Sequence, residues 1–132
     1  DPPADVEPLR ITLQPGAQPF RARTRRYGAA QSAVLPEHVH TLEKMGFVRR
    51  NNMSRWACAA VPVPKAGRPN EFRLTIDYRP VNVLTIPIAG TGADLTSSSE
   101  NVDGAYGFAG FDMPSGFSQL PLDDDSQEIM SF

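Results

Sequence analysis

With 132 residues, of which 40% are hydrophobic and 21% are charged, the chain is long enough for one hydrophobic core and short for a two-site enzyme. The single cysteine, Cys58, excludes an internal disulfide and is consistent with a reducing, intracellular compartment. The net charge of −2 is not that of a strongly basic nucleic-acid binder, and no apolar run is long enough to cross a membrane.

The charges are divided unevenly along the chain. All 13 Lys and Arg residues lie within residues 1–79, beside seven acids, whereas residues 80–132 contain eight acids and no base. A basic half is suited to phosphate groups, and an acidic half is suited to a metal ion. A protein that handles a phosphate ligand together with a metal ion needs both, although the asymmetry could also be accidental.

The first part of the chain is predicted to be extended. Residues 1–9 contain three prolines and are interpreted as a linker or lead-in, which leaves residues 10–132 as the folded part. Residues 10–13 are expected to form a short strand. An arginine-rich arm follows, which either lies along nucleic-acid phosphates or is simply an exposed segment; its arginines are Arg21, Arg23, Arg25 and Arg26.

A helix is predicted over residues 30–46, because apolar residues recur there at helical spacing. Pro36 is tolerable only in the first turn of such a helix, and Gly46 is a suitable stop. His38 and His40 are two residues apart and so do not share a helix face, which makes surface positions a better interpretation than a joint metal site.

A β-hairpin is predicted over residues 60–77, with a turn at residues 66–71. Phe72, Leu74 and Ile76 alternate with polar residues, as in a strand that is buried on one face. Lys65 is placed near the tip of this hairpin and Arg73 on its open face. The region after it, residues 93–105, is expected to contain only a weak helix.

The stretch from Phe108 to Phe117 is the most suggestive for chemistry. Residues 108–113 alternate as a strand, with Asp112 near its end, and a turn follows at residues 114–116. A carboxylate, backbone N–H groups and an aromatic ring so close together are compatible with a nucleotide site that holds Mg²⁺. On the pattern alone, a carboxylate that caps a turn at a strand edge is favoured.

One acidic run and one apolar run close the sequence. Asp123, Asp124 and Asp125 are interpreted as a solvated turn or a helix cap, because the glycine of a calcium-binding loop is missing. Residues 126–132 are interpreted as an apolar, strand-like run.

The sequence resembles the reverse transcriptases of gypsy-type LTR retrotransposons. The run Phe111-Asp-Met-Pro-Ser-Gly-Phe-Ser-Gln-Leu-Pro-Leu122 is similar to their first catalytic motif, and Phe72-Arg-Leu-Thr-Ile-Asp-Tyr-Arg-Pro-Val-Asn82 is similar to their nucleotide-binding hairpin. Residues 83–107 depart from the family pattern, and the family's second catalytic motif is not present. The resemblance implies an α+β fold: the fingers and partial palm of a right-hand polymerase, incomplete.

The resemblance also implies roles for individual residues in an RNA-directed DNA polymerase. Asp112 would be the catalytic carboxylate and, with the Met113 carbonyl, would hold Mg²⁺ or Mn²⁺. Arg79 would lie near the template. The incoming deoxynucleoside triphosphate would be bound by Lys65, Arg73, Ser115, Gly116 and Phe117.

The implied partners are an RNA or DNA template-primer, deoxynucleoside triphosphates and the remainder of the polymerase (palm, thumb and RNase H), with no membrane. The implied location is intracellular: the cytoplasm, a virus-like particle or the nucleus. The isolated chain is expected not to polymerise. A non-catalytic retroelement remnant that binds nucleic acid or protein remains as an alternative, and a metal-dependent hydrolase is a weaker third.

Overall fold

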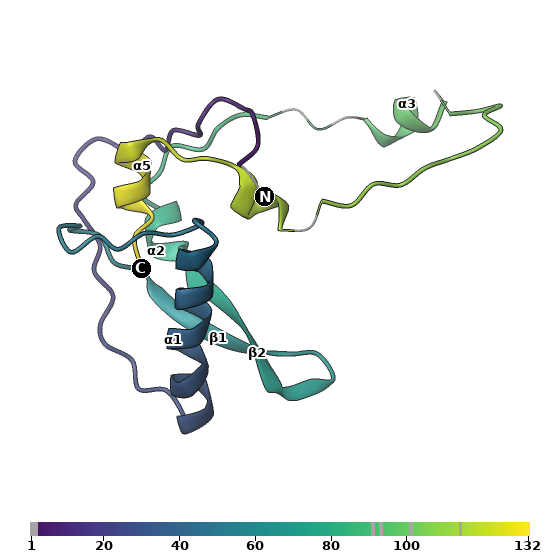
Figure 1. Ribbon diagram of the computed structural model, residues 1–132. Coiled ribbons are helices and arrows are strands. Elements are labelled where there is room, and N and C mark those ends of the chain that lie inside the picture. The colour runs from purple at the N-terminus through teal and green to yellow at the C-terminus, as the bar shows by residue number, and fades with distance from the viewer. Residues whose placement is uncertain (1–2, 91, 93, 101, 114) are drawn as a thin grey trace.

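The computed structural model describes residues 3–90, 92, 94–100, 102–113 and 115–132. Helix α1 lies beside a two-stranded antiparallel hairpin, and short helices follow it along the chain (Figure 1). The elements are α1 (Ala29–Lys44), β1 (Ala59–Lys65), β2 (Arg68–Asp77), α2 (Arg79–Asn82), α3 (Leu95–Glu100), α4 (Gly116–Gln119) and α5 (Asp124–Ile129). In the described part of the chain, no helix has the length and apolar character needed to span a membrane.

The predicted hairpin is confirmed. Strands β1 and β2 pair in register from Ala59 opposite Asp77 to Pro64 opposite Phe72, with an irregularity before Lys65. The turn is tighter than expected, because Ala66 and Gly67 alone connect the strands and Gly67 takes a positive φ of 71°. The ring of Phe72 is buried, which fixes the face that β2 turns towards the protein.

The predicted helix is also confirmed, as α1, although it ends slightly earlier than expected. Gly46 has a φ of 78°, its N–H donates to Glu43, and the Phe47 N–H donates to Leu42. This pair of bonds is the Schellman arrangement that satisfies the last carbonyls of a helix. The expectation for Pro36 was wrong: it lies in the interior of α1 and not in the first turn.

The hydrophobic core is small and joins distant parts of the sequence. Its buried members are Trp56, Cys58, Val81 and Ile129. Burial of the Cys58 thiol raises its pKa, and the nearby Asp77 carboxylate adds to this effect. The thiol is therefore a packed, inert group in this fold.

The beginning and the end of the described chain run side by side. The Leu9 N–H donates to the Pro121 carbonyl at 2.9 Å, and the Asp123 N–H donates to the Leu9 carbonyl at 3.2 Å. The Ile11 N–H donates to the fully buried Ser126 hydroxyl at 2.7 Å. These bonds tie residues 9–11 to the segment that contains α5. The domain division at residue 9 stays a prediction.

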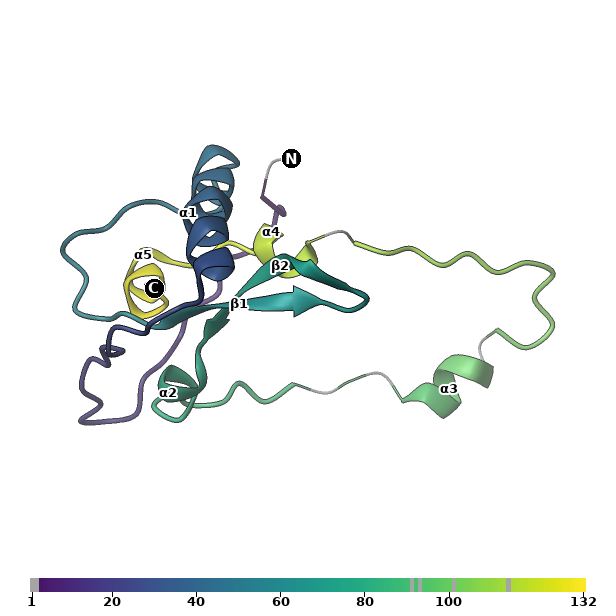
Figure 2. The ribbon, with the colours of Figure 1, turned by 90° about the horizontal axis from the view of Figure 1, so that it is seen from below.

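Three strand predictions were wrong. Residues 10–13 form no strand: within the described residues, their strand-type pairing is limited to an isolated bridge between Leu13 and Thr85. Residues 108–113 form no strand: they are exposed and lie on a long excursion that carries α3 away from the hairpin (Figures 1 and 2). A strand needs a neighbour to pair its backbone groups, and the described residues offer none to this stretch. Residues 126–132 are not strand-like either. Asp123 accepts a hydrogen bond from the Ser126 N–H at 2.9 Å and thereby caps helix α5.

The expectation that Asp123 acts as a cap is therefore confirmed, and the thin helix expected within residues 93–105 is present as α3. The described fold is small and contains both α-helices and one two-stranded antiparallel sheet. The assignment to polymerase fingers and palm stays a prediction.

Candidate functional site

The β1–β2 hairpin carries three basic side chains, of which two are engaged. Lys65 Nζ lies 3.1 Å from Glu71 Oε2, and an Arg68 guanidinium nitrogen lies 3.3 Å from the same oxygen. These two cations hold the pKa of the Glu71 carboxyl below its usual value. Arg73, opposite Val63, is exposed, and its side chain makes no hydrogen bond or ion pair with the described part of the chain.

Arg79 is placed at the base of the hairpin, where it is held by Asp77. Its Nε and Nη2 atoms lie 2.8 Å from Asp77 Oδ1 and Oδ2 respectively, which is a bidentate pair. An Arg25 nitrogen approaches Asp77 Oδ2 at 3.5 Å from the arginine-rich arm. The hydrogen bonds from Arg79 lower the pKa of Asp77 to about 2, with a smaller contribution from Arg25.

A second group of predicted site residues lies where the excursion returns to α4. Asp112 is exposed and has no hydrogen-bonding or ion-pair partner in the described part of the chain. The Met113 carbonyl accepts a hydrogen bond from the Gly116 N–H at 3.1 Å. Ser115 adopts a left-handed φ of 54° before helix α4, and the Phe117 ring is 95% exposed.

These residues supply ligands of a suitable kind for Mg²⁺, but they do not make a complete site. Asp112 offers a carboxylate, whereas the Met113 carbonyl is already used by Gly116. No group of three or more His, Cys, Asp or Glu side chains with metal-binding geometry occurs within the described residues. The residues that the structure describes therefore do not fit a resident metal ion by themselves.

The structure does not bring the two groups of predicted residues together. Figure 1 shows the tip of the hairpin well apart from the excursion that carries α3 and residues 102–113, although both extend to the same side of the protein. Lys65 and Arg73 belong to the hairpin, whereas Asp112 and Phe117 belong to the excursion and its return. The predicted nucleotide site is thus divided into a basic part and an acidic part.

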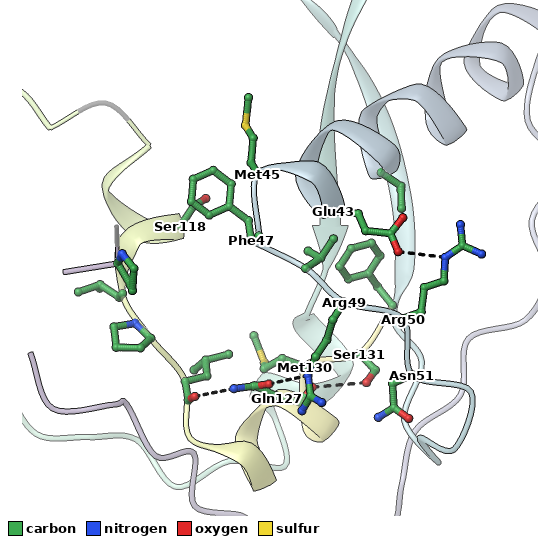
Figure 3. Close-up of a pocket in the computed structure, with 18 of the residues that line it drawn as sticks. Glu43, Met45, Phe47, Arg49, Arg50, Asn51, Ser118, Gln127, Met130 and Ser131 are labelled. Carbon is green, nitrogen blue, oxygen red and sulfur yellow. Dashed lines mark hydrogen bonds and ion pairs between the residues drawn. The ribbon is translucent and has the colours of Figure 1, made fainter. Parts of the chain in front are cut away.

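Sequence reasoning missed a cavity of about 640 Å³ between the loop after α1, residues 118–122 and the end of α5 (Figure 3). Phe47 and Met130 contribute apolar surface to its lining. Arg50 is paired with Glu43 at 3.1 Å, and the Arg49 guanidinium donates to Gln127 at 3.1 Å. The run Phe47-Val-Arg-Arg50, in which two apolar residues precede two arginines, was the sequence signal for this cavity.

Sequence reasoning also missed the role of Asp77. A second cavity, of about 530 Å³, is lined by Arg25, Asp77, Arg79 and neighbouring residues of β1, β2 and α2. The carboxylate sits between the two arginines, so part of their positive charge is neutralised locally. The alternation of Arg73, Thr75 and Asp77 along one face of β2 was the signal for this placement.

No protein-family model matches the chain. A retrovirus-related Pol polyprotein from transposon opus of Drosophila melanogaster is 25% identical over 107 residues, which cover 79% of this chain and 11% of that protein. A retrovirus-related Pol polyprotein from transposon 412 of the same organism is 30% identical over 115 residues, which cover 83% of this chain and 9% of that protein. The chain thus spans about a tenth of the length of these relatives. These similarities support the conclusion that the chain is derived from a retroelement Pol polyprotein sequence.

Proposed function

We propose that the chain is the fingers and first palm portion of a gypsy-type reverse transcriptase, and that its hairpin binds the triphosphate of an incoming deoxynucleotide. The similarity to Pol polyproteins supports a retroelement origin. The observation that carries the nucleotide role is Arg73, whose guanidinium is exposed and unpaired on the open face of β2.

A guanidinium in this position is suited to a phosphate group. It offers several donors in a planar fork, so it can contact two phosphate oxygens at once. The neighbouring Phe72 is buried and so anchors the strand from which Arg73 projects. Lys65, near the tip of the same hairpin, would add a second positive charge when it exchanges Glu71 for the ligand.

The acidic part of the proposed site comes from the excursion and its return. Asp112 is the proposed metal-binding carboxylate, and the backbone at Ser115 and Gly116 is proposed to approach the phosphates. Phe117 is proposed to lie under the sugar. Because the described residues do not complete a metal site, nucleotide addition is proposed only for a polymerase that includes further segments of the Pol protein.

The test is binding of a fluorescent dATP analogue to the full chain at low salt, without a divalent cation. Arg73→Gln should weaken binding by roughly tenfold to a hundredfold, since a charge-assisted hydrogen bond contributes about 1.5–3 kcal/mol. Arg68→Gln is the matched control, because it removes the same charge from a side chain that is already paired with Glu71. Equal losses in both variants, or no loss in Arg73→Gln, would contradict the proposal.

A second candidate function is nucleic-acid binding by a non-catalytic remnant. The arm between residues 21 and 26 favours it, because its four arginines are exposed and follow one another along an extended backbone. The arm is held in place by the Ala22 N–H, which donates to the Ala57 carbonyl at 2.8 Å. A row of fixed cations along one segment is an electrostatic footprint for a phosphate backbone.

A further inference from the structure

We propose that the segment Tyr106–Asp112 is an endoproteolytic site for proteases that accept aromatic side chains, and that the cut chain remains one folded body. This inference does not depend on nucleotide binding. It rests on two observations: the isolation of this segment from the rest of the protein, and the bonds that join the parts on either side of it.

The segment is open on all sides. Every residue from Tyr106 to Asp112 is exposed, and none makes a hydrogen bond with the described part of the chain. Tyr106 is 109% exposed and Phe111 is 97% exposed, so their rings have no packing partners. A protease must bind several residues of its substrate in an extended form, and here no structure has to be broken to provide them.

The composition of the segment also suits such an enzyme. Tyr106, Phe108 and Phe111 present three aromatic side chains for a hydrophobic specificity pocket, and the glycines at 107 and 110 leave the backbone uncrowded. Three aromatic residues in the body are protected by comparison. Trp56 and Phe72 are buried, and Tyr78 is half-buried and donates its hydroxyl hydrogen to the Met130 carbonyl at 3.0 Å.

The parts on either side of the segment hold each other without it. The Cys58 N–H donates to the Ser131 carbonyl at 2.8 Å, and the Ile11 N–H donates to the Ser126 hydroxyl at 2.7 Å. Ile129 packs into the core with Trp56 and Val81, which come from the other part of the chain. Breaking one peptide bond in the excursion removes none of these contacts.

Hydrolysis adds one water molecule across the peptide bond, which leaves a carboxylate on the N-terminal piece and an amine on the C-terminal piece. The protease supplies the catalysis and the solvent supplies the water. The expected product is a two-chain protein in which α5 remains docked. A cut after Tyr106, Phe108 or Phe111 also leaves Asp112 on the same piece as α5.

The experiment is limited digestion of the full chain with chymotrypsin, followed by mass spectrometry and native size-exclusion chromatography. The first cut is expected after Tyr106, Phe108 or Phe111, at a rate that low concentrations of urea do not change, because cleavage does not await unfolding. Both pieces should elute together at the volume of the uncut protein and should separate only under denaturing conditions.

The triple variant Tyr106→Ser, Phe108→Ser, Phe111→Ser should be cut at least tenfold more slowly, with an unchanged far-ultraviolet circular dichroism spectrum. Phe117→Ser is the control variant: its ring is equally exposed, but its backbone lies in the hydrogen-bonded turn of α4, so the cleavage rate should not change. A first cut outside residues 106–112, or release of the C-terminal piece under native conditions, would overturn the inference.

Discussion

At the scale of single residues, the carboxylate of Asp77 has a strongly lowered pKa and a clear partner. Arg79 contacts both of its oxygens at 2.8 Å and lowers its pKa to about 2. A lowered pKa stabilises the fold above the ordinary carboxyl pKa of about 4, and this contribution is lost as the pH falls towards 2. The contribution is modest, because the Arg79 side chain is 85% exposed.

The prediction is that Arg79→Gln raises the pKa of Asp77 towards that of a free carboxyl, as measured by ¹³C NMR titration of the side chain. The physical reason is loss of the two guanidinium hydrogen bonds, which leaves the backbone N–H of residue 79 and the more distant Arg25 as the remaining partners of the carboxylate. Arg10→Gln serves as the control, because Arg10 pairs with Asp123 and not with Asp77. An unchanged Asp77 titration in Arg79→Gln would show that the ion pair does not persist in solution.

Ser126 is a second residue whose contacts predict a measurable effect. Its buried hydroxyl accepts the Ile11 N–H at 2.7 Å. Ser126→Ala leaves that donor unsatisfied and should lower the free energy of unfolding by about 1–3 kcal/mol, as measured by urea denaturation. Ser98→Ala, on the exposed surface of α3, should cost far less. Equal losses in the two variants would argue against a special role for the Ser126 hydroxyl.

At the scale of elements, α1 carries a proline in its interior. Pro36 has no N–H to donate to the preceding turn of the helix. Its side chain is exposed, so packing does not compensate for the lost hydrogen bond. Pro36→Ala should therefore raise the free energy of unfolding by up to about 3 kcal/mol. Glu37→Ala, at the next exposed position, is the control and should change it little. A lower unfolding midpoint in Pro36→Ala would contradict this account.

The hairpin and α1 could be predicted because local sequence decides them. Alternation from Phe72 to Ile76 and the turn residue Gly67 specify the hairpin, and Gly46 specifies where α1 stops. Pro36 was misplaced because tertiary and neighbouring helical contacts can outweigh the preference of one residue.

The wrong strand predictions have a different cause. An alternating run such as residues 108–113 shows which face a strand would bury, but it does not show that a partner strand exists. The short apolar run after Asp125 is equally compatible with a helix and a strand, and the hydrogen bond from Ser126 to Asp123 favours the helix.

The candidate site was predictable only in part. The exposure of Arg73 follows from its position on the polar face of β2. The pairing of Lys65 with Glu71, and that of Arg79 with Asp77, depends on side-chain geometry that spacing does not give. The separation of Asp112 from the hairpin depends on the path of the whole excursion, which residues 83–107 did not specify.

At the scale of the whole molecule, the uneven charge distribution predicts weak nucleic-acid binding that depends steeply on salt. Each arginine that contacts a phosphate releases a counterion, so Arg23→Gln should reduce the salt slope of log K by about 1. Fluorescence anisotropy with a labelled single strand measures the slope. Arg50→Gln, which removes a cation already paired with Glu43, should leave it unchanged. Binding that ignores salt would remove the argument from the basic arm.

Because early and late segments of the chain pair with each other, we expect the protein to fold slowly. The bond from Ile11 to Ser126 joins residues 115 positions apart, and the Arg10 to Asp123 pair joins residues 113 positions apart. The entropy of closing such large loops has to be overcome before the contacts contribute, and proteins dominated by distant contacts fold slowly. On the ribosome, the hairpin and α1 can form early, while Trp56 and Val81 must wait for Ile129 to emerge before their shared interior is shielded from water.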